Sequence, residues 1–81
     1  MEKIYNNSEK QESQDHTLAT NLKRIRLEKW FTQKSLSEIS DVKYTVITKI
    51  EIWAIREPSV YTCLKIAKAL WISVEELIWE I

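Results

Sequence analysis

The chain has 81 residues and a formal net charge of zero, with 12 Lys or Arg residues against 12 Asp or Glu residues. We expect one small domain with a helical core and no room for a second domain. The balanced charge argues against a purely electrostatic nucleic-acid binder, but residues 17–56 carry a net charge of +4 while the segments on either side each carry −2. Positive charge gathered in one segment is typical of a nucleic-acid-binding surface.

Cysteine and histidine each occur once, at Cys63 and His16. A single cysteine permits no internal disulfide, and one cysteine with one histidine cannot form an ordinary zinc site. We therefore expect no metal or other cofactor, and a reducing, cytoplasmic location. The sequence has no apolar run approaching the roughly 20 residues of a membrane span and no hydrophobic signal core at its N-terminus. We expect no membrane partner.

Residues 1–16 are polar and acidic, and we expect them to form a disordered or frayed arm. The folded domain is predicted to occupy residues 17–81. Its first helix is predicted to begin at Thr17, a candidate N-cap, because Leu18, Leu22 and Ile25 then form an apolar stripe. The basic residues of this helix fall on its other faces, where solvated side chains are the usual outcome: Lys23, Arg24, Arg26 and Lys29.

Two short helical patterns meet at a tight turn within residues 33–52. Both have apolar residues at helical spacing, which predicts one shared buried seam. The seam residues are Leu36, Ile39, either Val46 or Ile47, and Ile50. The opposite side of the second pattern carries two cations, two hydroxyls and a phenol, from Lys43, Tyr44, Thr45, Thr48 and Lys49. Ammonium groups suit phosphates, and the other groups suit base edges, sugars or the thymine methyl, so this face is a candidate DNA-binding surface.

This segment resembles the helix-turn-helix of the lambda-repressor-like family, also called the Xre or Cro/CI type. The residues that carry the resemblance are Gln33, Leu36, Ser37, Ser40, Asp41, Val42, Ile47 and Ile50. Residues 21–30 are similar to that family's first helix, and residues 57–78 to its fourth and fifth. The resemblance implies an all-α fold, a compact five-helix domain preceded by a flexible arm. It also implies a transcriptional repressor that reads the major groove of double-stranded DNA with its third helix, as a homodimer.

The resemblance further implies roles for individual residues. Gln33 would contact the DNA backbone and brace the third helix, and Arg24 matches a basic position that contacts phosphate. Thr32 is a candidate N-cap that places Gln33 and Lys34 in the first turn of the second helix, where free backbone N–H groups suit a phosphate oxygen. In many relatives the brace includes a second glutamine at the position of Tyr44, so that Gln–Gln pair is absent here.

The last third of the chain predicts two more helices. Arg56, in the loop before them, is a further candidate for a phosphate contact. Pro58 and Ser59 predict a loop end and an N-cap. The expected apolar stripe of the fourth helix is Val60, Leu64, Ala67 and Leu70, flanked by Cys63 and Ile66. Ser73 is predicted to cap the last helix, whose early acids, Glu75 and Glu76, argue against DNA contact. We expect that end to pack on the domain or pair with a second copy.

The sequence contains four tryptophans and no glycine, although glycine averages about 7% of residues in proteins. Trp30, Trp53 and Trp71 each follow a helical pattern, where helices commonly end in a left-handed glycine, and the family commonly has glycine at all three. The tryptophans could be genuine, with remodelled helix ends and an indole surface for a partner. They could instead be engineered, or be glycines encoded by UGA and translated as tryptophan. Trp79 needs no glycine, and Asp41, at the tight turn, tolerates a left-handed backbone better than most residues.

Two other classes of function compete with DNA binding. An enzyme is not expected, because the sequence lacks a Gly-rich phosphate loop and a nucleophile with its base, and the adjacent Glu75 and Glu76 do not share a helix face. No small-molecule substrate is therefore indicated. A protein-interaction module is the stronger alternative, because a helix-turn-helix scaffold does not require DNA binding and exposed tryptophans favour protein contacts. The antitoxin of a toxin–antitoxin pair, with the toxin as partner, is a further alternative.

Overall fold

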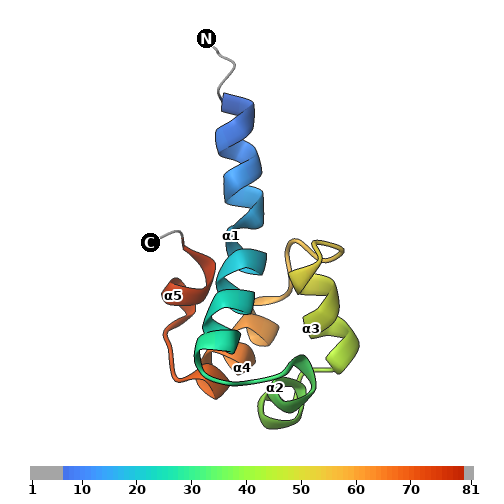
Figure 1. Cartoon of the computed structure of the whole chain (residues 1–81). Coiled ribbons are helices and arrows are strands. Elements are labelled where there is room, and N and C mark those ends of the chain that lie inside the picture. The colour runs from blue at the N-terminus through green and yellow to red at the C-terminus, as the bar shows by residue number, and fades with distance from the viewer. Residues whose placement is uncertain (1–6, 80–81) are drawn as a thin grey trace.

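Five helices make up the computed structural model, which describes the backbone of residues 7–79 and the side chains of residues 18–79. They are α1 (Asn7–Glu28), α2 (Gln33–Ser40), α3 (Tyr44–Glu51), α4 (Val60–Leu70) and α5 (Val74–Ile78). The long α1 packs against α3 and α5, while α2 contacts α3 and α4. Helices α4 and α5 also contact each other, so the four short helices pack together around the second half of α1 (Figure 1). The all-α, five-helix prediction is confirmed.

The first helix begins at Asn7, well before the predicted start at Thr17. Its first turns extend beyond the other helices (Figure 1), and no residue in this segment is a proline or glycine that would end a helix. Thr17 is therefore inside α1 and does not cap it. Residues 1–6 lie outside the described part of the chain, and a separate N-terminal arm stays a prediction.

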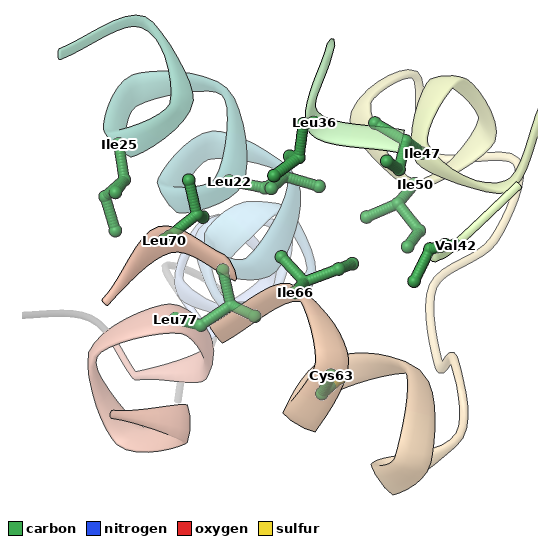
Figure 2. Close-up of a cluster of buried hydrophobic side chains, with 10 residues drawn as sticks. All are labelled: Leu22, Ile25, Leu36, Val42, Ile47, Ile50, Cys63, Ile66, Leu70 and Leu77. Atoms are coloured by element: carbon green, nitrogen blue, oxygen red, sulfur yellow. The ribbon is translucent and has the colours of Figure 1, made fainter. Parts of the chain in front are cut away.

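The hydrophobic core lies where α1, α2, α3, α4 and α5 face one another (Figure 2). It contains Leu22, Ile25, Leu36, Val42, Ile47, Ile50, Cys63, Ile66, Leu70 and Leu77, which are at most 7% exposed. The predicted stripe of α1 is confirmed, because Leu18 packs against this cluster beside Leu22 and Ile25. The choice between Val46 and Ile47 is also resolved, since Ile47 is fully buried and Val46 only partly.

Three predicted core positions are wrong. Ile39 is 58% exposed, because the neighbouring Ser40 turns inward and its hydroxyl accepts a hydrogen bond from the Val42 backbone N–H (3.2 Å). In α4 the predicted stripe has the wrong phase over its first two turns, where Val60 and Leu64 are exposed. The buried residues follow the alternative helical spacing, Cys63, Ile66, Ala67 and Leu70.

Side-chain caps fix three helix starts at the predicted residues. The Thr32 hydroxyl accepts the Ser35 N–H, and a reciprocal hydrogen bond completes a capping box at α2. Ser59 caps α4 by accepting the Thr62 N–H. At α5, the Ser73 hydroxyl accepts a hydrogen bond from the Glu76 N–H. The Glu76 carboxylate accepts one from the Ser73 N–H, which completes a second capping box. Such caps satisfy backbone donors that have no partner within the helix.

The short helix α5 is tied to α1 by a buried asparagine that the sequence gave no reason to single out. The Asn21 side-chain amide donates to the backbone carbonyls of Leu77 (3.0 Å) and Trp79 (2.7 Å). The Leu77 carbonyl lies in the last turn of α5, where helical acceptors lack intrahelical donors, and Trp79 is the residue directly after the helix. Asn21 thus caps α5 from another helix.

Four residues of the described chain have a left-handed backbone, and none is glycine: Trp30 (φ 67°), Asp41 (φ 62°), Trp53 (φ 76°) and Trp71 (φ 62°). All four follow a helix end, as the sequence predicts. Trp79 has φ −101° and lies outside the left-handed region. Among residues 7–79, no helix combines the length and apolar character that crossing a membrane would require.

Replacing Asn21 with alanine is expected to lower the free energy of unfolding by about 1–3 kcal/mol, because it leaves buried carbonyls of α5 without a donor. Urea denaturation followed by circular dichroism measures the change. The matched control is Lys23→Ala on the exposed side of the same helix, for which a change within about 0.5 kcal/mol is expected. Equal effects of the two substitutions would show that Asn21 does not anchor α5.

Candidate nucleic-acid interface

A hydrogen bond holds the start of the turn between α2 and α3. Asp41 adopts the left-handed conformation (φ 62°, ψ 29°), and its N–H donates to the Ser37 carbonyl (3.0 Å). The Val42 side chain then enters the core, where it is 6% exposed. Asp fits this position because its short polar side chain reduces the cost of a left-handed backbone. The turn therefore sets the angle between α2 and α3 without a glycine.

Helix α3 has one face in the core and one in solvent. Ile47 and Ile50 are at most 1% exposed, so they fix which side of the helix faces inward. The outward residues are Lys43 at the N-cap, Tyr44, Thr45 and Lys49, all exposed, with Thr48 half-buried at the edge. The structure thus leaves the face that the sequence singled out as a candidate DNA-binding surface uncovered within the described chain.

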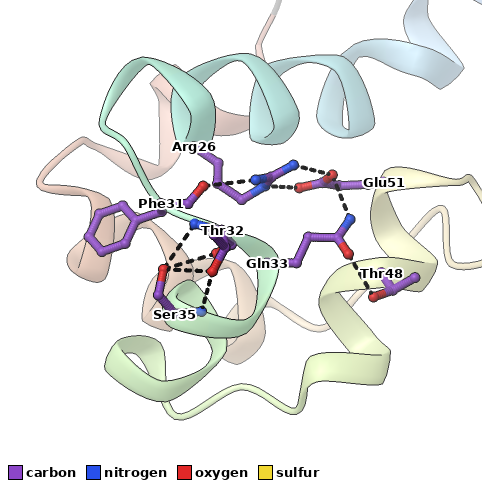
Figure 3. Close-up of polar contacts among 7 residues, drawn as sticks. All are labelled: Arg26, Phe31, Thr32, Gln33, Ser35, Thr48 and Glu51. Carbon is purple, nitrogen blue, oxygen red and sulfur yellow. Dashed lines mark hydrogen bonds and ion pairs between the residues drawn. The ribbon is translucent and has the colours of Figure 1, made fainter.

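Gln33 braces the start of α2 against the last turn of α3. Its side-chain Nε2 donates to Oε1 of Glu51 (2.9 Å), and its Oε1 accepts a hydrogen bond from the Thr48 hydroxyl (3.2 Å; Figure 3). The predicted brace is present, and Glu51 and Thr48 make it in place of the missing second glutamine. Tyr44 takes another position: it lines a shallow hollow with Lys34, Ser37 and Glu38 of α2.

A buried ion pair joins α1 to the end of α3. Arg26 Nε lies 2.7 Å from Glu51 Oε2 and its Nη2 lies 3.0 Å from Oε1, a two-point contact, and the two side chains are only 8% and 3% exposed. A third bond runs from Arg26 Nη1 to the Phe31 carbonyl (2.8 Å; Figure 3). Buried charges are tolerated when they are paired and their remaining donors are bonded in this way.

The prediction that Arg26 lies on a face of α1 away from the core stripe was therefore wrong. Arg26 lies four residues after Leu22 and so projects from the same face of α1 as the core stripe. The Glu51 carboxylate accepts bonds from both Arg26 and Gln33, and so connects α1, α2 and α3. The sequence does contain a signal for this pair: Arg26 is a charge at a core-facing position of α1, and Glu51 is an opposite charge directly after Ile50. The two lie 25 residues apart, so the signal was missed.

The remaining candidate residues lie around this network. Arg24 is half-exposed on α1 and pairs with Glu28 at 3.4 Å, an exposed contact. It lines a shallow hollow with Trp53 and Glu51, and the guanidinium of Arg56 lies 5.6 Å from the Trp53 ring. Arg24 and Arg56 are thus both near Trp53 at the end of α3. Lys34 is exposed in the first turn of α2.

Another hollow lies between α1, the loop before α4, α4 and α5, and Arg56 is among the residues that line it. Its lining includes Cys63, and burial raises the pKa of that thiol. A raised pKa disfavours the thiolate, which is the nucleophilic form. The chemistry of this hollow therefore gives no support to covalent catalysis.

Arg26→Ala is expected to lower the free energy of unfolding by about 3–5 kcal/mol, because it leaves the Glu51 carboxylate buried without its partner. The double variant Arg26→Met with Glu51→Leu should lose less than the single variant, since it removes both charges and keeps apolar volume. Urea denaturation of the single and double variants measures this coupling. Arg24→Ala is the control for an exposed pair and should change stability by less than about 1 kcal/mol. If the effects of the Arg26 and Glu51 substitutions on stability were simply additive, that result would contradict a coupled buried pair.

The comparison with protein families identifies the fold. The helix-turn-helix family model HTH_3 matches residues 22–77, which cover α2, α3, α4 and most of the buried core. No curated protein and no solved structure matches the chain. The matched segment begins at Leu22 on the core face of α1 and ends at Leu77 of α5, so it contains the turn, the brace and the ion pair. The chain belongs to the HTH_3 family of DNA-binding helix-turn-helix domains, the Cro/C1 type within the lambda-repressor-like Xre family.

Proposed function

We propose that the protein is a sequence-specific transcriptional repressor that inserts residues 43–49 of α3 into the major groove of double-stranded DNA. The observation that carries this proposal is the outer face of α3, whose cationic and hydroxyl side chains the core does not use. An α-helix fits the major groove, and base edges there differ for every base pair. Because Ile47 and Ile50 are locked in the core, the outer face cannot rotate away without unfolding the domain.

Phosphate contacts are proposed for residues around α3. Gln33 and Lys34 lie in the first turn of α2, where backbone N–H groups point out of the helix and favour an anion. The Gln33 amide has two N–H donors, and Glu51 takes one of them, which leaves the other for a phosphate oxygen. Lys43, Lys49, Arg24 and Arg56 add charged donors, and such contacts set the position of the protein on the duplex.

Base reading is proposed for Tyr44 and Thr45, which are exposed at the start of α3. Recognition helices commonly contact base edges with their N-terminal residues. Thr48 has a narrower role, because its hydroxyl proton already goes to Gln33. It can offer a base only an acceptor lone pair or its methyl group. Sequence preference should therefore depend more on Thr45 than on Thr48.

A homodimer on a two-fold related site is part of the proposal. The net charge of residues 17–56 is only +4 and that of the whole chain is zero, so one domain supplies few phosphate contacts, and a second copy doubles both these contacts and the base contacts. Apolar side chains at the start of α4 and the end of α5 are in solvent, among them Val60 (73% exposed) and Ile78 (38%). These residues also line the hollow between α1, α4 and α5, which supports pairing through this part of the molecule.

A protein-interaction role is the second candidate, as a module without DNA or as an antitoxin that binds a toxin. It is favoured by two nearly fully exposed indoles, Trp30 (93%) and Trp71 (88%). Large exposed aromatic side chains are enriched at protein interfaces. If this role is the principal one, substitutions at Trp30 and Trp71 would abolish the biological effect while substitutions on α3 would not.

Substitutions on the proposed interface are expected to separate positioning contacts from base readers. Lys49→Ala and Arg24→Ala should weaken binding to all sequences and lower the salt slope of log K by about 1 each. Thr45→Ala should change the preferred sequence, because a base contact discriminates by about 1–3 kcal/mol. Binding-site selection from randomised duplexes, followed by fluorescence anisotropy at several salt concentrations, measures both effects.

The control for the charge substitutions is Lys68→Ala, which removes an exposed cation from the last turn of α4. This variant should keep both the affinity and the salt slope. A Thr45→Ala protein that selects the same sequences as the original would count against base reading by Thr45. A salt slope lowered equally by Lys68→Ala would mean that binding depends on net charge alone and not on the proposed surface.

A further inference from the structure

Three of the four tryptophans occupy a backbone conformation that favours glycine. Trp30, Trp53 and Trp71 have φ values of 67°, 76° and 62°, and each lies one or two residues after the last residue of a helix. A β-carbon in this region approaches the neighbouring carbonyl oxygen, which is why glycine predominates there. The helix ends are therefore not remodelled to suit a large side chain.

The hydrogen bonds at two of these ends form the complete pattern that terminates helices with a left-handed residue. After α1, the Trp30 N–H donates to the Leu27 carbonyl (3.1 Å) and the Phe31 N–H to the Arg26 carbonyl (3.0 Å). After α4, the Trp71 N–H donates to the Lys68 carbonyl and the Ile72 N–H to the Ala67 carbonyl. Phe31 and Ile72 also pack against the core, as the apolar residue after the left-handed position commonly does in this motif.

The third end is a variant of the same arrangement. The Trp53 N–H donates to the Ile50 carbonyl (3.2 Å), and the N–H of Ile55 closes the longer ring to the Lys49 carbonyl (3.1 Å). At all three helix ends, tryptophan thus adopts the left-handed backbone conformation that glycine usually adopts there. The sequence nevertheless contains no glycine.

Burial of the indoles does not offset the backbone cost at two of the sites. Trp30 is 93% exposed and Trp71 is 88% exposed, so these side chains remove little apolar surface from water. Trp53 differs, because it is half-buried and its ring lies near the Arg56 guanidinium. Trp79 provides an internal comparison, since its backbone (φ −101°, ψ 150°) is open to any residue.

We propose that residues 30, 53 and 71 are glycines in the protein that the cell makes, encoded by UGA codons that its ribosomes read as glycine. The tryptophans in the sequence then result from translating these UGA codons with a different genetic code. This accounts together for the surplus of tryptophan, the absence of glycine and the three left-handed helix ends. It also removes the two exposed indoles on which the protein-interaction role depends, and it does not depend on DNA binding.

The backbone part of the proposal is tested by paired substitutions in the full chain. Trp→Gly and Trp→Ala variants at positions 30 and 71 both remove the indole, and they differ only in the β-carbon. The glycine variant should have an unfolding equilibrium constant about fivefold lower than the alanine variant at each site, because the strain of a left-handed β-carbon exceeds the extra freedom of unfolded glycine. The same pair at position 79 is the control, where alanine should be at least as stable as glycine.

Urea denaturation gives the unfolding equilibrium constants. Because both variants at a site lack the indole, any effect of its removal on stability is the same for both and does not affect the comparison. Alanine variants as stable as the glycine variants at positions 30 and 71 would overturn the proposal. Position 53 is left out of this comparison because loss of the Trp53 ring contacts would mask the backbone effect.

The identity of the residues is tested directly by the codons and by the native protein. The expected result is UGA at positions 30, 53 and 71 of the gene, with glycine at these positions in peptides analysed by mass spectrometry from the source cells. A UGG codon at any of the three positions, or tryptophan there in the native peptides, would overturn the proposal for that position.

Discussion

The contact on which the domain depends is the buried carboxylate of Glu51 at the end of α3. It accepts a two-point ion pair from Arg26 on α1 and a hydrogen bond from Gln33 on α2. Few apolar contacts could impose the same geometry, because a planar guanidinium and a carboxylate bind only in a narrow range of orientations. Removing either charge leaves the other buried, which makes the pair a strict requirement of the fold even if its net contribution to stability is modest.

This network positions the nucleic-acid-binding surface without forming part of it. The core residues Ile47 and Ile50 set the rotation of α3, the left-handed Asp41 sets its angle to α2, and the Glu51 network fixes its far end. The outer face is thereby held rigid before any ligand binds, and a preformed surface loses little conformational entropy on binding. The buried charge of Arg26 is neutralised by Glu51. The cations available to phosphates are therefore the ones on the outer surface.

Local features of the chain were predictable from the sequence, whereas long-range polar contacts were not. The caps at Thr32, Ser59 and Ser73 and the left-handed helix ends follow from residues within one turn of each site, and all are confirmed. The phase of α4 was wrong because an eleven-residue helix with many apolar positions allows two stripes, and packing against other helices, among them α2 and α5, selects between them. Arg26 and Asn21 were missed because their partners lie 25 and more than 50 residues away. Their polarity suggested solvent, whereas specific partners draw them into the interior. The roles of the surface residues on α3 follow from chemistry and family membership, and they stay predictions.

The most direct test of this account is to map the amide chemical shifts of the labelled protein during titration with a duplex obtained by binding-site selection. We expect the largest changes at residues 43–49 and in the first turn of α2, with the buried amides of α4 and α5 little affected. Changes confined to α4 and α5, or no change with any duplex at low ionic strength, would contradict the central claim that the free face of α3 binds DNA.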